Sequence, residues 1–326
     1  MGTPESAVAP LGYLLENAAA NDYQVLAVVT QAPKLQGRGK KKKLCDPPVA
    51  VFAKSKNISC LQPLKASDEE FLLALEKLGP DVIITCAYGQ ILSSRFLEIP
   101  QRATINIHPS ALPKYRGATP VPAALLAGDP VTAVSILFTV KALDAGAIIL
   151  QKEFAIGDDE ICDALTMRLF KEAGPMLLEA FKKLDNLDFR GTPQDETSVS
   201  LCHKITKDLG LINWTKDSKT IYNQFRAYNS WPGSYSYMDS KRVLFEEMQR
   251  NDAECIANLK LKLASLEKKP KPGSCFFDKK RNLIAVKSQD DWLFVSRLKP
   301  AGSKSVDAIS FWNGLVGSSD ETRFFS

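Results

Sequence analysis

Residues 104–117 read Thr-Ile-Asn-Ile-His-Pro-Ser-Ala-Leu-Pro-Lys-Tyr-Arg-Gly, and this stretch decides how the rest of the chain is interpreted. Isoleucines alternate with Asn106 and His108, a pattern that predicts a β-strand, and the strand ends at Pro109 because proline cannot extend a sheet ladder. Side chains two positions apart project from the same face of a strand. Open α/β sheets keep their chemistry at strand ends, so the carboxamide and the imidazole are candidate catalytic groups.

Asp144 is the predicted third member of this site. It follows the β-branched run 131–140, and Gly146 permits a tight turn that presents the carboxylate at the tip of a second strand. An Asn, a His and an Asp without a nucleophilic Ser or Cys suggest direct acyl transfer, with an oxyanion to stabilise and an amine proton to remove. The alternative is that His108 is a core histidine and Asp144 a turn residue, and spacing alone leaves both interpretations open.

The motifs Asn106-x-His108-x-Ser110-x-Leu112-Pro113-x-x-Arg116-Gly117 and Leu143-Asp144-x-Gly146 resemble the signature of enzymes that transfer the formyl group of 10-formyltetrahydrofolate. The resemblance runs from Gly2 nearly to the C-terminus. It also rests on Gly2-Thr3-Pro4, Gly37-Arg38-Gly39-Lys40-Lys41, Ala87-Tyr88-Gly89-Gln90 and Arg226-Ala227-Tyr228-Asn229-x-Trp231-Pro232. Each motif is weak by itself, whereas their common order makes the match specific.

The resemblance implies a formyl transferase that takes 10-formyltetrahydrofolate as co-substrate, needs no metal, and modifies the α-amino group of methionine on initiator tRNA. In this interpretation Asn106 helps to hold the oxyanion, His108 acts as electrophile and proton carrier, and Asp144 orients His108 and accepts the proton. The implied folate-binding residues are Ala87, Tyr88, Gly89, Gln90, Ser110, Ala111, Leu112 and Pro113. The implied tRNA-binding residues, on a loop rich in breakers, are Arg38, Lys40, Lys41, Lys42 and Lys43.

Length and periodicity predict two domains within the 326 residues. Strands and helices alternate over 1–184, which predicts an α/β, Rossmann-like domain with a mostly parallel sheet and helices on both faces. A polar segment at 185–200 is interpreted as a linker. Short apolar runs separated by turns over 201–326 predict a small antiparallel β-barrel, and the resemblance implies an OB-like one.

Composition limits the classes of function. Residues 1–199 carry 21 basic and 23 acidic side chains, a charge of −2, whereas residues 200–326 carry 21 and 14, a charge of +7. A basic C-terminal domain suggests a polyanionic partner, for which nucleic acid is the natural candidate. No apolar run reaches the ~20 residues of a membrane span. The seven scattered cysteines and two histidines suggest neither a disulfide framework nor a zinc site, and we expect a monomer.

The start of the chain departs from the family pattern. A helix is predicted almost immediately after Gly2-Thr3-Pro4, a motif that follows the first strand of the sheet in the family. We therefore expect this strand to be missing and its two neighbouring strands to be left unpaired. Residues 23–30 are predicted to form a buried parallel strand. The departure keeps a non-catalytic RNA-binding relative as an alternative function. A second alternative is a formyltransferase or hydrolase with a small-molecule substrate, although five clustered cations argue against it. Lysine-rich insertions suggest a mitochondrial location.

Overall fold

A computed structural model describes residues 1–37, 42–250, 254–257, 259, 269–315 and 323–326. The described chain divides into two units. Unit 1 comprises residues 1–120, 131–156 and 164–203, and unit 2 comprises residues 121–130, 157–163 and 204–326. This division differs from the sequence-based one, because the segment 185–200 packs with unit 1 and two earlier segments pack with unit 2. No helix in the part of the chain that the structure describes is long and apolar enough to cross a membrane.

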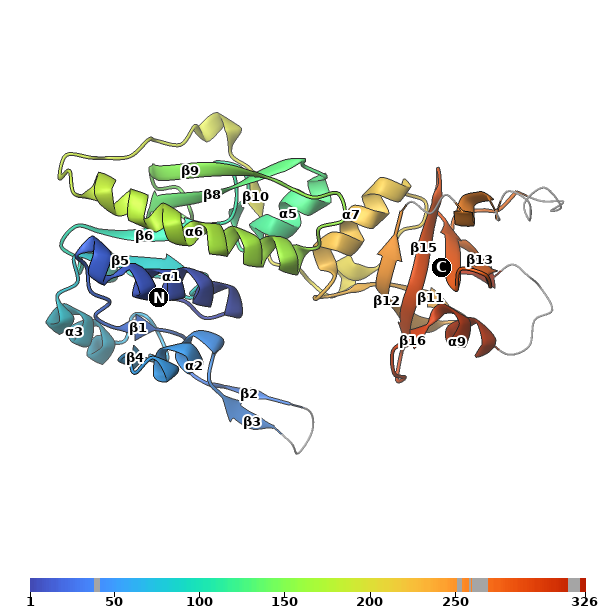
Figure 1. Cartoon of the computed structure of the whole chain (residues 1–326), viewed down its shortest axis with the longest axis horizontal. Coiled ribbons are helices and arrows are strands. Elements are labelled where there is room, and N and C mark those ends of the chain that lie inside the picture. Colours follow the sequence, from blue (N-terminus) through green and yellow to red (C-terminus); the bar gives the residue numbers. More distant parts are fainter. Residues whose placement is uncertain (38–41, 251–253, 258, 260–268, 316–322) are drawn as a thin grey trace. The chain divides into compact units, whose positions relative to one another are not determined.

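The main sheet of unit 1 has the strand order β5-β6-β8-β9 (Figure 1). These strands cover Val82–Cys86, Ala103–His108, Val131–Phe138 and Ile148–Ala155. β5 and β6 are parallel, whereas β8 runs antiparallel to both β6 and β9. A separate parallel pair is formed by β1 (Val28–Val29) and β4 (Cys60–Leu61). Alternating strands and helices with parallel pairs confirm the predicted Rossmann-like class.

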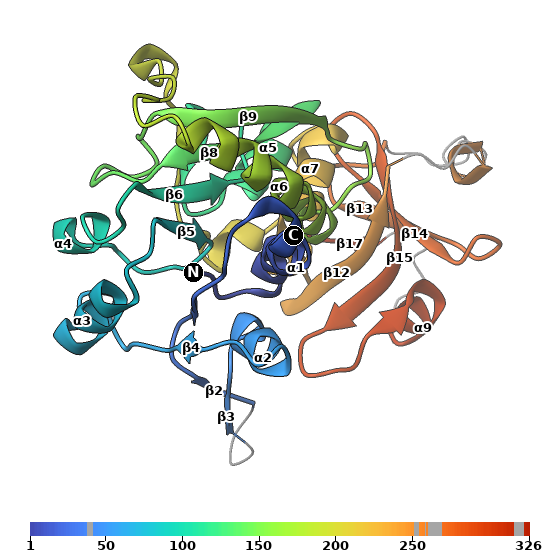
Figure 2. The same ribbon diagram turned by 60° about the vertical axis from the view of Figure 1, so that its left-hand side comes forward.

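Helices cover both faces of this sheet. Figure 2 shows β5 and β6 between α3 and α4 on one side and α1 and α6 on the other. On the first side, Phe71 and Leu75 of α3 pack with Ile83 of β5 in a hydrophobic cluster. On the second side, Gly174 lets α6 approach α1 closely, because a Cβ at this position would lie 2.7 Å from Tyr13. The bounds are Val8–Asn17 for α1, Pro48–Ser55 for α2, Glu69–Leu78 for α3, Ser94–Leu97 for α4 and Cys162–Leu184 for α6.

The predicted strand at 23–30 is largely wrong, because only Val28–Val29 is a strand. On the β4 side, the N–H groups of Val28 and Thr30 donate to Ser59 and Leu61 at 2.8 and 3.0 Å. On the other side the neighbour is the very start of the chain. The Gly2 N–H donates to the Val29 carbonyl at 2.9 Å, and the Met1 carbonyl accepts from the Cys86 N–H at 2.9 Å. β1 is therefore limited to the short stretch that has hydrogen-bonding partners on both sides.

Unit 2 is built on an antiparallel sheet with the order β11-β12-β15-β14-β13-β17, with β16 paired to β15. Its C-terminal residue, Ser326, exchanges two backbone hydrogen bonds with Tyr237 of β11, at 2.9 and 3.0 Å. The last strand is thereby joined to the first, which produces the predicted small barrel. The strands are Ser234–Met238, Lys241–Gln249, Ser274–Asp278, Leu283–Lys287, Trp292–Pro300, Val306–Asp307 and Arg323–Phe324 for β11 to β17 in order.

Helices α7 (Ser218–Tyr228) and α9 (Ala308–Asn313) pack on one part of the barrel core of unit 2. They contribute Phe225 and Phe311 to the core that Phe245 and Phe325 share. Arg226 of α7 is buried, and its guanidinium finds hydrogen-bonding partners there. It donates to the carbonyls of residues 157 and 160, at 3.1 and 3.3 Å, and to the Asn223 side chain. The earlier segment 157–163 is thereby attached to unit 2. A further helix, α5 (Pro120–Ala127), lies almost entirely in this unit.

Candidate active site

Three predicted residues meet at one end of the sheet in unit 1. Asn106 and His108 occupy the end of β6, and Asp144 lies in the turn between β8 and β9. The Asn106 amide donates to Asp144 Oδ1 at 3.3 Å, and His108 Nδ1 lies 3.6 Å from Asp144 Oδ2. Their side chains therefore converge, as the spacing within the strand predicted. Thr85 of β5 donates its hydroxyl to Asn106 Oδ1 at 2.8 Å and so fixes which way the carboxamide faces.

His108 is held as a neutral imidazole. Its side chain is 5% exposed, and burial lowers the pKa of His108 below its ordinary value, while the Asp144 charge and the Tyr115 carbonyl oppose the shift. Nε2 lies 3.0 Å from the Tyr115 carbonyl oxygen, which can only accept, so Nε2 carries the proton. Nδ1 then presents a lone pair beside a carboxylate. A proton that arrives at Nδ1 would be stabilised by the Asp144 charge.

The turn that carries Asp144 has unusual backbone requirements. Asp144 adopts a φ of +48°, which is uncommon outside glycine. Gly146 packs so closely on β8 that a Cβ there would lie 1.8 Å from the Phe138 carbonyl oxygen. Asp144 Oδ2 accepts the Gly117 N–H at 2.9 Å, and Gly117 itself has a φ of +126°. The glycines of both sequence motifs are thus explained by close packing and by backbone conformation.

Gln194 holds this turn in place and was not predicted. Its side-chain amide donates to the carbonyl oxygens of Asp144 and Gly146, at 2.7 and 2.8 Å. Its oxygen accepts from Arg116 Nε at 3.0 Å, and the same guanidinium pairs with Glu196 at 2.8 Å. Gln194 lies in the polar segment that was interpreted as a linker. No sequence signal distinguishes it, because its role depends on a contact 50 residues away along the chain.

The segment 87–90 follows β5 at the same end of the sheet. Ala87 and Gly89 are exposed and have φ angles of +48° and +81°, so backbone groups are presented to the surroundings. A Cβ at Gly89 would lie 2.6 Å from the Gln31 side chain. In contrast, the side chains of Tyr88 and Gln90 face inward. The Tyr88 ring is buried, and the Gln90 side-chain oxygen accepts from the Ala66 N–H at 2.6 Å. The exposed backbone groups of Ala87 and Gly89 are available to contact a ligand.

The second predicted folate segment, 110–113, contributes mainly structural side chains. Ser110 and Leu112 are buried, and the Ser110 hydroxyl donates to the Lys114 carbonyl at 2.7 Å. The Leu112 carbonyl accepts from the Gln151 side chain at 3.0 Å. Ala111 and Pro113 are half-buried and can line a wall.

Two of the predicted tRNA-binding residues, Lys42 and Lys43, lie at the start of β3 (Lys43–Cys45), which pairs antiparallel with β2 (Lys34–Gln36). Lys42 and Lys43 are exposed. The other three predicted residues, Arg38, Lys40 and Lys41, lie outside the described residues.

Within the described ranges, no group of three or more His, Cys, Asp or Glu side chains has a geometry that could hold a metal ion.

Comparison with known families matches both parts of the chain. Residues 7–181 match the family "Formyl transferase", and residues 204–316 match "Formyl transferase, C-terminal domain". A curated relative, the methionyl-tRNA formyltransferase of Ruminiclostridium cellulolyticum, is 38% identical over 74% of this chain and 76% of its own length. The methionyl-tRNA formyltransferase of Carboxydothermus hydrogenoformans is 34% identical over 98% of both chains.

Solved structures share the fold at low identity. The sugar 3N-formyl transferase WlaRD aligns over 93% of this chain and 97% of its own, with a TM-score of 0.61 and 18% identity. HypX from Aquifex aeolicus in complex with tetrahydrofolic acid aligns over 84% of this chain and 47% of its own, with a TM-score of 0.59 and 18% identity. At this identity the likeness concerns the fold alone.

Proposed function

The chain belongs to the formyl transferase family, and from this premise we propose that it transfers the formyl group of 10-formyltetrahydrofolate to the α-amino group of methionyl initiator tRNA. The observation that carries this proposal is the convergence of Asn106, His108 and Asp144. The curated relatives that match over nearly the whole length are methionyl-tRNA formyltransferases, which supports the choice of substrate.

The folate co-substrate supplies a formyl group that is already activated on nitrogen. The amine of methionine attacks the formyl carbon, a new C–N bond forms, and the bond to the folate nitrogen breaks. The amine must lose a proton, and His108 Nδ1 is the group arranged to take it, since Nε2 is committed to the Tyr115 carbonyl. The proton can then pass to the leaving folate nitrogen, so that the imidazole is neutral again.

Asn106 and Asp144 have complementary roles in this step. The Asn106 carboxamide has two N–H bonds, one of which is directed at Asp144, and the other can donate to the oxyanion that develops on the formyl oxygen. Asp144 stabilises the imidazolium form of His108 while the proton resides there. The backbone at 87–89, together with Ala111 and Pro113, would hold the folate. Preorganised donors of this kind are typically the largest single contribution to catalysis.

We assign recognition of tRNA to the basic residues 38 and 40–43 and to the basic C-terminal part of the chain, residues 200–326, whose net charge is +7. Exposed Lys42 and Lys43 beside a hairpin are free to approach phosphates, and phosphate contacts weaken as salt concentration rises. The double variant Lys42→Ala/Lys43→Ala should raise KM for tRNA and reduce its salt dependence, with KM for folate unchanged. Lys182→Ala/Lys183→Ala, on two exposed lysines at the end of α6, is the matched control. Equal loss of folate and tRNA use in the first variant would contradict the assignment.

We further propose that the protein acts as a monomer in mitochondria, where translation starts with formylmethionine. The lysine-rich segments support an organellar eukaryotic origin, although the relatives described above are bacterial. Fractionation of cells that express the protein tests the location, and analytical ultracentrifugation tests the assembly state.

A further inference from the structure

The segment 192–203, which we call the clamp, is the last part of unit 1 and contacts two parts of the catalytic site. Near its start, Gln194 holds the turn of Asp144 through the two hydrogen bonds described above. Its end includes β10 (Leu201–Cys202), which pairs in parallel with β7 (Arg116–Gly117). β7 follows the loop that leaves the catalytic end of β6. The clamp thus contacts the turn that carries the carboxylate and the loop that follows the imidazole.

Ser200 of the clamp makes three hydrogen bonds to the end of this loop. Its hydroxyl accepts from the Tyr115 N–H at 2.9 Å, and its carbonyl accepts from the Arg116 N–H at 2.9 Å. Its own N–H donates to the Pro113 carbonyl at 3.3 Å. Tyr115 has a φ of +60°, a conformation that is unfavourable for a residue other than glycine. Surrounding contacts must hold such a residue, and the bonds to Ser200 do this.

Cys202 contacts the same loop two residues further along the clamp. Its buried thiol lies 3.3 Å from the Tyr115 carbonyl oxygen and 3.4 Å from the Arg116 carbonyl oxygen. The sulfur in turn accepts the Thr119 N–H at 3.4 Å. Packing is close here, because a Cβ on Gly117 would collide with the Cys202 carbonyl. The thiol therefore limits the directions in which the Tyr115 carbonyl can point.

The direction of the Tyr115 carbonyl matters because the His108 ring lies between two acceptors. Nε2 is 3.0 Å from the Tyr115 oxygen, and Nδ1 is 3.6 Å from Asp144 Oδ2. A neutral imidazole carries one proton, so it can donate to only one of them, and the shorter contact favours the proton on Nε2. If the Tyr115 carbonyl turned away, the proton would move to Nδ1 and bind the carboxylate. Nδ1 could then no longer take a proton from an amine.

We propose that Ser200 and Cys202 are positioning residues that hold the Tyr115 carbonyl on Nε2 of His108 and thereby keep Nδ1 available as the proton acceptor. The use of Nδ1 rests on the proposed function, whereas the position of the ring proton is a property of the free protein. Ser200→Ala removes the bond to the Tyr115 N–H and leaves the backbone bonds of this position in place. The Nδ1–H form of His108 should become populated, and kcat should fall roughly tenfold with KM for folate unchanged.

Nitrogen-15 NMR of the free, full chain shows directly which ring nitrogen carries the proton. Protonated and unprotonated ring nitrogens of a neutral histidine have well-separated resonances. The chain has only two histidines, so labelled histidine gives few signals, and His108→Gln identifies those of His108. The other histidine, His203, is exposed and serves as an internal reference. Spectra are recorded at a pH at which His108 is neutral, and the unchanged chain should carry the proton on Nε2.

A first control variant, Ser198→Ala, removes a hydroxyl from the same segment. The Ser198 side chain is exposed and donates to Asp195 Oδ2 at 2.6 Å rather than to the loop. The position of the His108 proton should therefore stay unchanged. Ser200→Thr is the conservative counterpart of the test variant, because it keeps the hydroxyl, and it should restore both the Nε2–H form and kcat.

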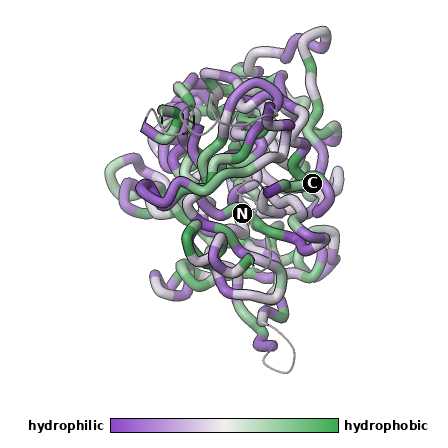
Figure 3. Tube along the Cα trace, turned by 90° about the vertical axis from the view of Figure 1, so that its right-hand side faces the viewer, coloured by the Kyte–Doolittle hydropathy of each residue, from purple (hydrophilic) through white to green (hydrophobic). Residues whose placement is uncertain are grey.

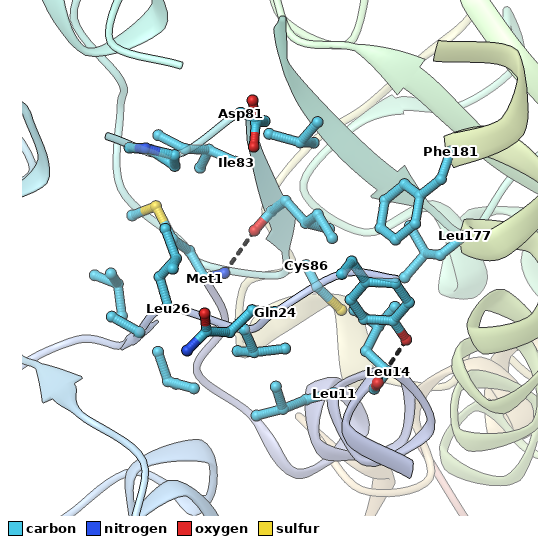
Figure 4. Close-up of a pocket in the computed structure, with 18 of the residues that line it drawn as sticks. Met1, Leu11, Leu14, Gln24, Leu26, Asp81, Ile83, Cys86, Leu177 and Phe181 are labelled. Atoms are coloured by element: carbon cyan, nitrogen blue, oxygen red, sulfur yellow. Dashed lines mark hydrogen bonds between the residues drawn. The ribbon is translucent and has the colours of Figure 1, made fainter. Parts of the chain in front are cut away.

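A second control variant, Leu177→Val, lowers stability elsewhere in unit 1. Hydrophobic stretches surround the start of the chain in the view of Figure 3, and a cavity of about 800 Å³ lies there. Leu177 of α6 is fully buried and lines this cavity (Figure 4). Asn106, His108 and Asp144 are not among the described residues that line it. Leu177→Val should therefore reduce the unfolding temperature and leave the His108 proton on Nε2.

The proposal predicts an Nδ1–H signal of His108 in both Ser200→Ala and Cys202→Ala, and no such signal in the two controls. It is overturned if both test variants keep the proton on Nε2, or if Leu177→Val shifts the proton as much as they do. If Ser200→Ala does not fold, Cys202→Ala decides between these results. The spectra do not depend on formyl transfer. A chain that binds no folate or transfers no formyl group would contradict the proposed function and leave this test intact.

Discussion

Replacing Gln194 with methionine removes the amide that binds the carbonyl oxygens of Asp144 and Gly146, while chain length is nearly kept. The Asp144 carboxylate then keeps its hydrogen bonds from the Gly117 N–H and the Asn106 amide, but the backbone carbonyls of the turn lose their side-chain donor. Asp144 has a φ of +48°, a conformation that is unfavourable for a residue other than glycine, so the backbone of the turn should relax once these two hydrogen bonds are lost. Movement of its carboxylate would alter the environment of His108 Nδ1, 3.6 Å away.

The expected magnitudes differ for stability and for catalysis. Gln194→Met removes two neutral hydrogen bonds of about 1 kcal/mol each and the charge-assisted bond from Arg116 Nε, so it should lower the free energy of unfolding by roughly 2–5 kcal/mol. A catalytic group displaced by about 1 Å can lose roughly 10²-fold in rate, so kcat should fall by about 10- to 100-fold, with KM for folate nearly unchanged.

The chain offers a matched control. In unit 2, Gln224 also donates its side-chain amide to two carbonyls, of Leu209 and Leu211, at 3.0 and 3.1 Å. Gln224→Met removes two neutral hydrogen bonds and should lower the free energy of unfolding by roughly 1–3 kcal/mol, while kcat stays unchanged. Urea unfolding and initial rates of formylation measure both quantities. If Gln194→Met loses stability but keeps its kcat, as the control does, Gln194 does not position Asp144.

Three further predictions concern the same site. Burial lowers the pKa of His108, so below pH 6.5 the unfolded chain binds a proton at this residue more readily than the folded chain does. The free energy of unfolding, measured with urea, should therefore fall as the pH drops below 6.5. His108→Gln should flatten this part of the pH dependence. Asn106→Ala removes the candidate oxyanion donor and should lower kcat roughly 10²- to 10³-fold, whereas an intact kcat in steady-state assays would exclude that role. Gly146→Ala places a Cβ 1.8 Å from the Phe138 carbonyl and should cost about 3 kcal/mol or more; calorimetry that shows a normal unfolding temperature would contradict the packing described.

Much of the fold could be predicted from the sequence because its signals are local. The strands of the barrel follow short apolar runs between turns, as in β11 (Ser234–Met238) and β13 (Ser274–Asp278), and this pattern predicted the barrel. The convergence of Asn106 and His108 follows from strand alternation within six residues. In these cases the pattern and the structure depend on the same neighbouring residues.

The features that the sequence did not predict share a different physical cause. Residues 23–27 have the composition of a strand, but the parallel pairing with β4 includes only Val28 and Val29. Pairing depends on residues far away in sequence. Gln194 and Gln90 bind distant backbone groups, which no local pattern encodes. The inward orientation of Tyr88 is also decided by tertiary packing, since the motif around it is the same whether the ring or the backbone faces the ligand.

The most direct test of the central claim is formylation of initiator methionyl-tRNA by the full chain, with 10-formyltetrahydrofolate as donor, beside the variant His108→Ala. The amine proton has one arranged acceptor, so the chain should form formylmethionyl-tRNA at least about 10²-fold faster than the folded variant. Equal rates for the two proteins, both shown to be folded and to bind tRNA, would contradict the account.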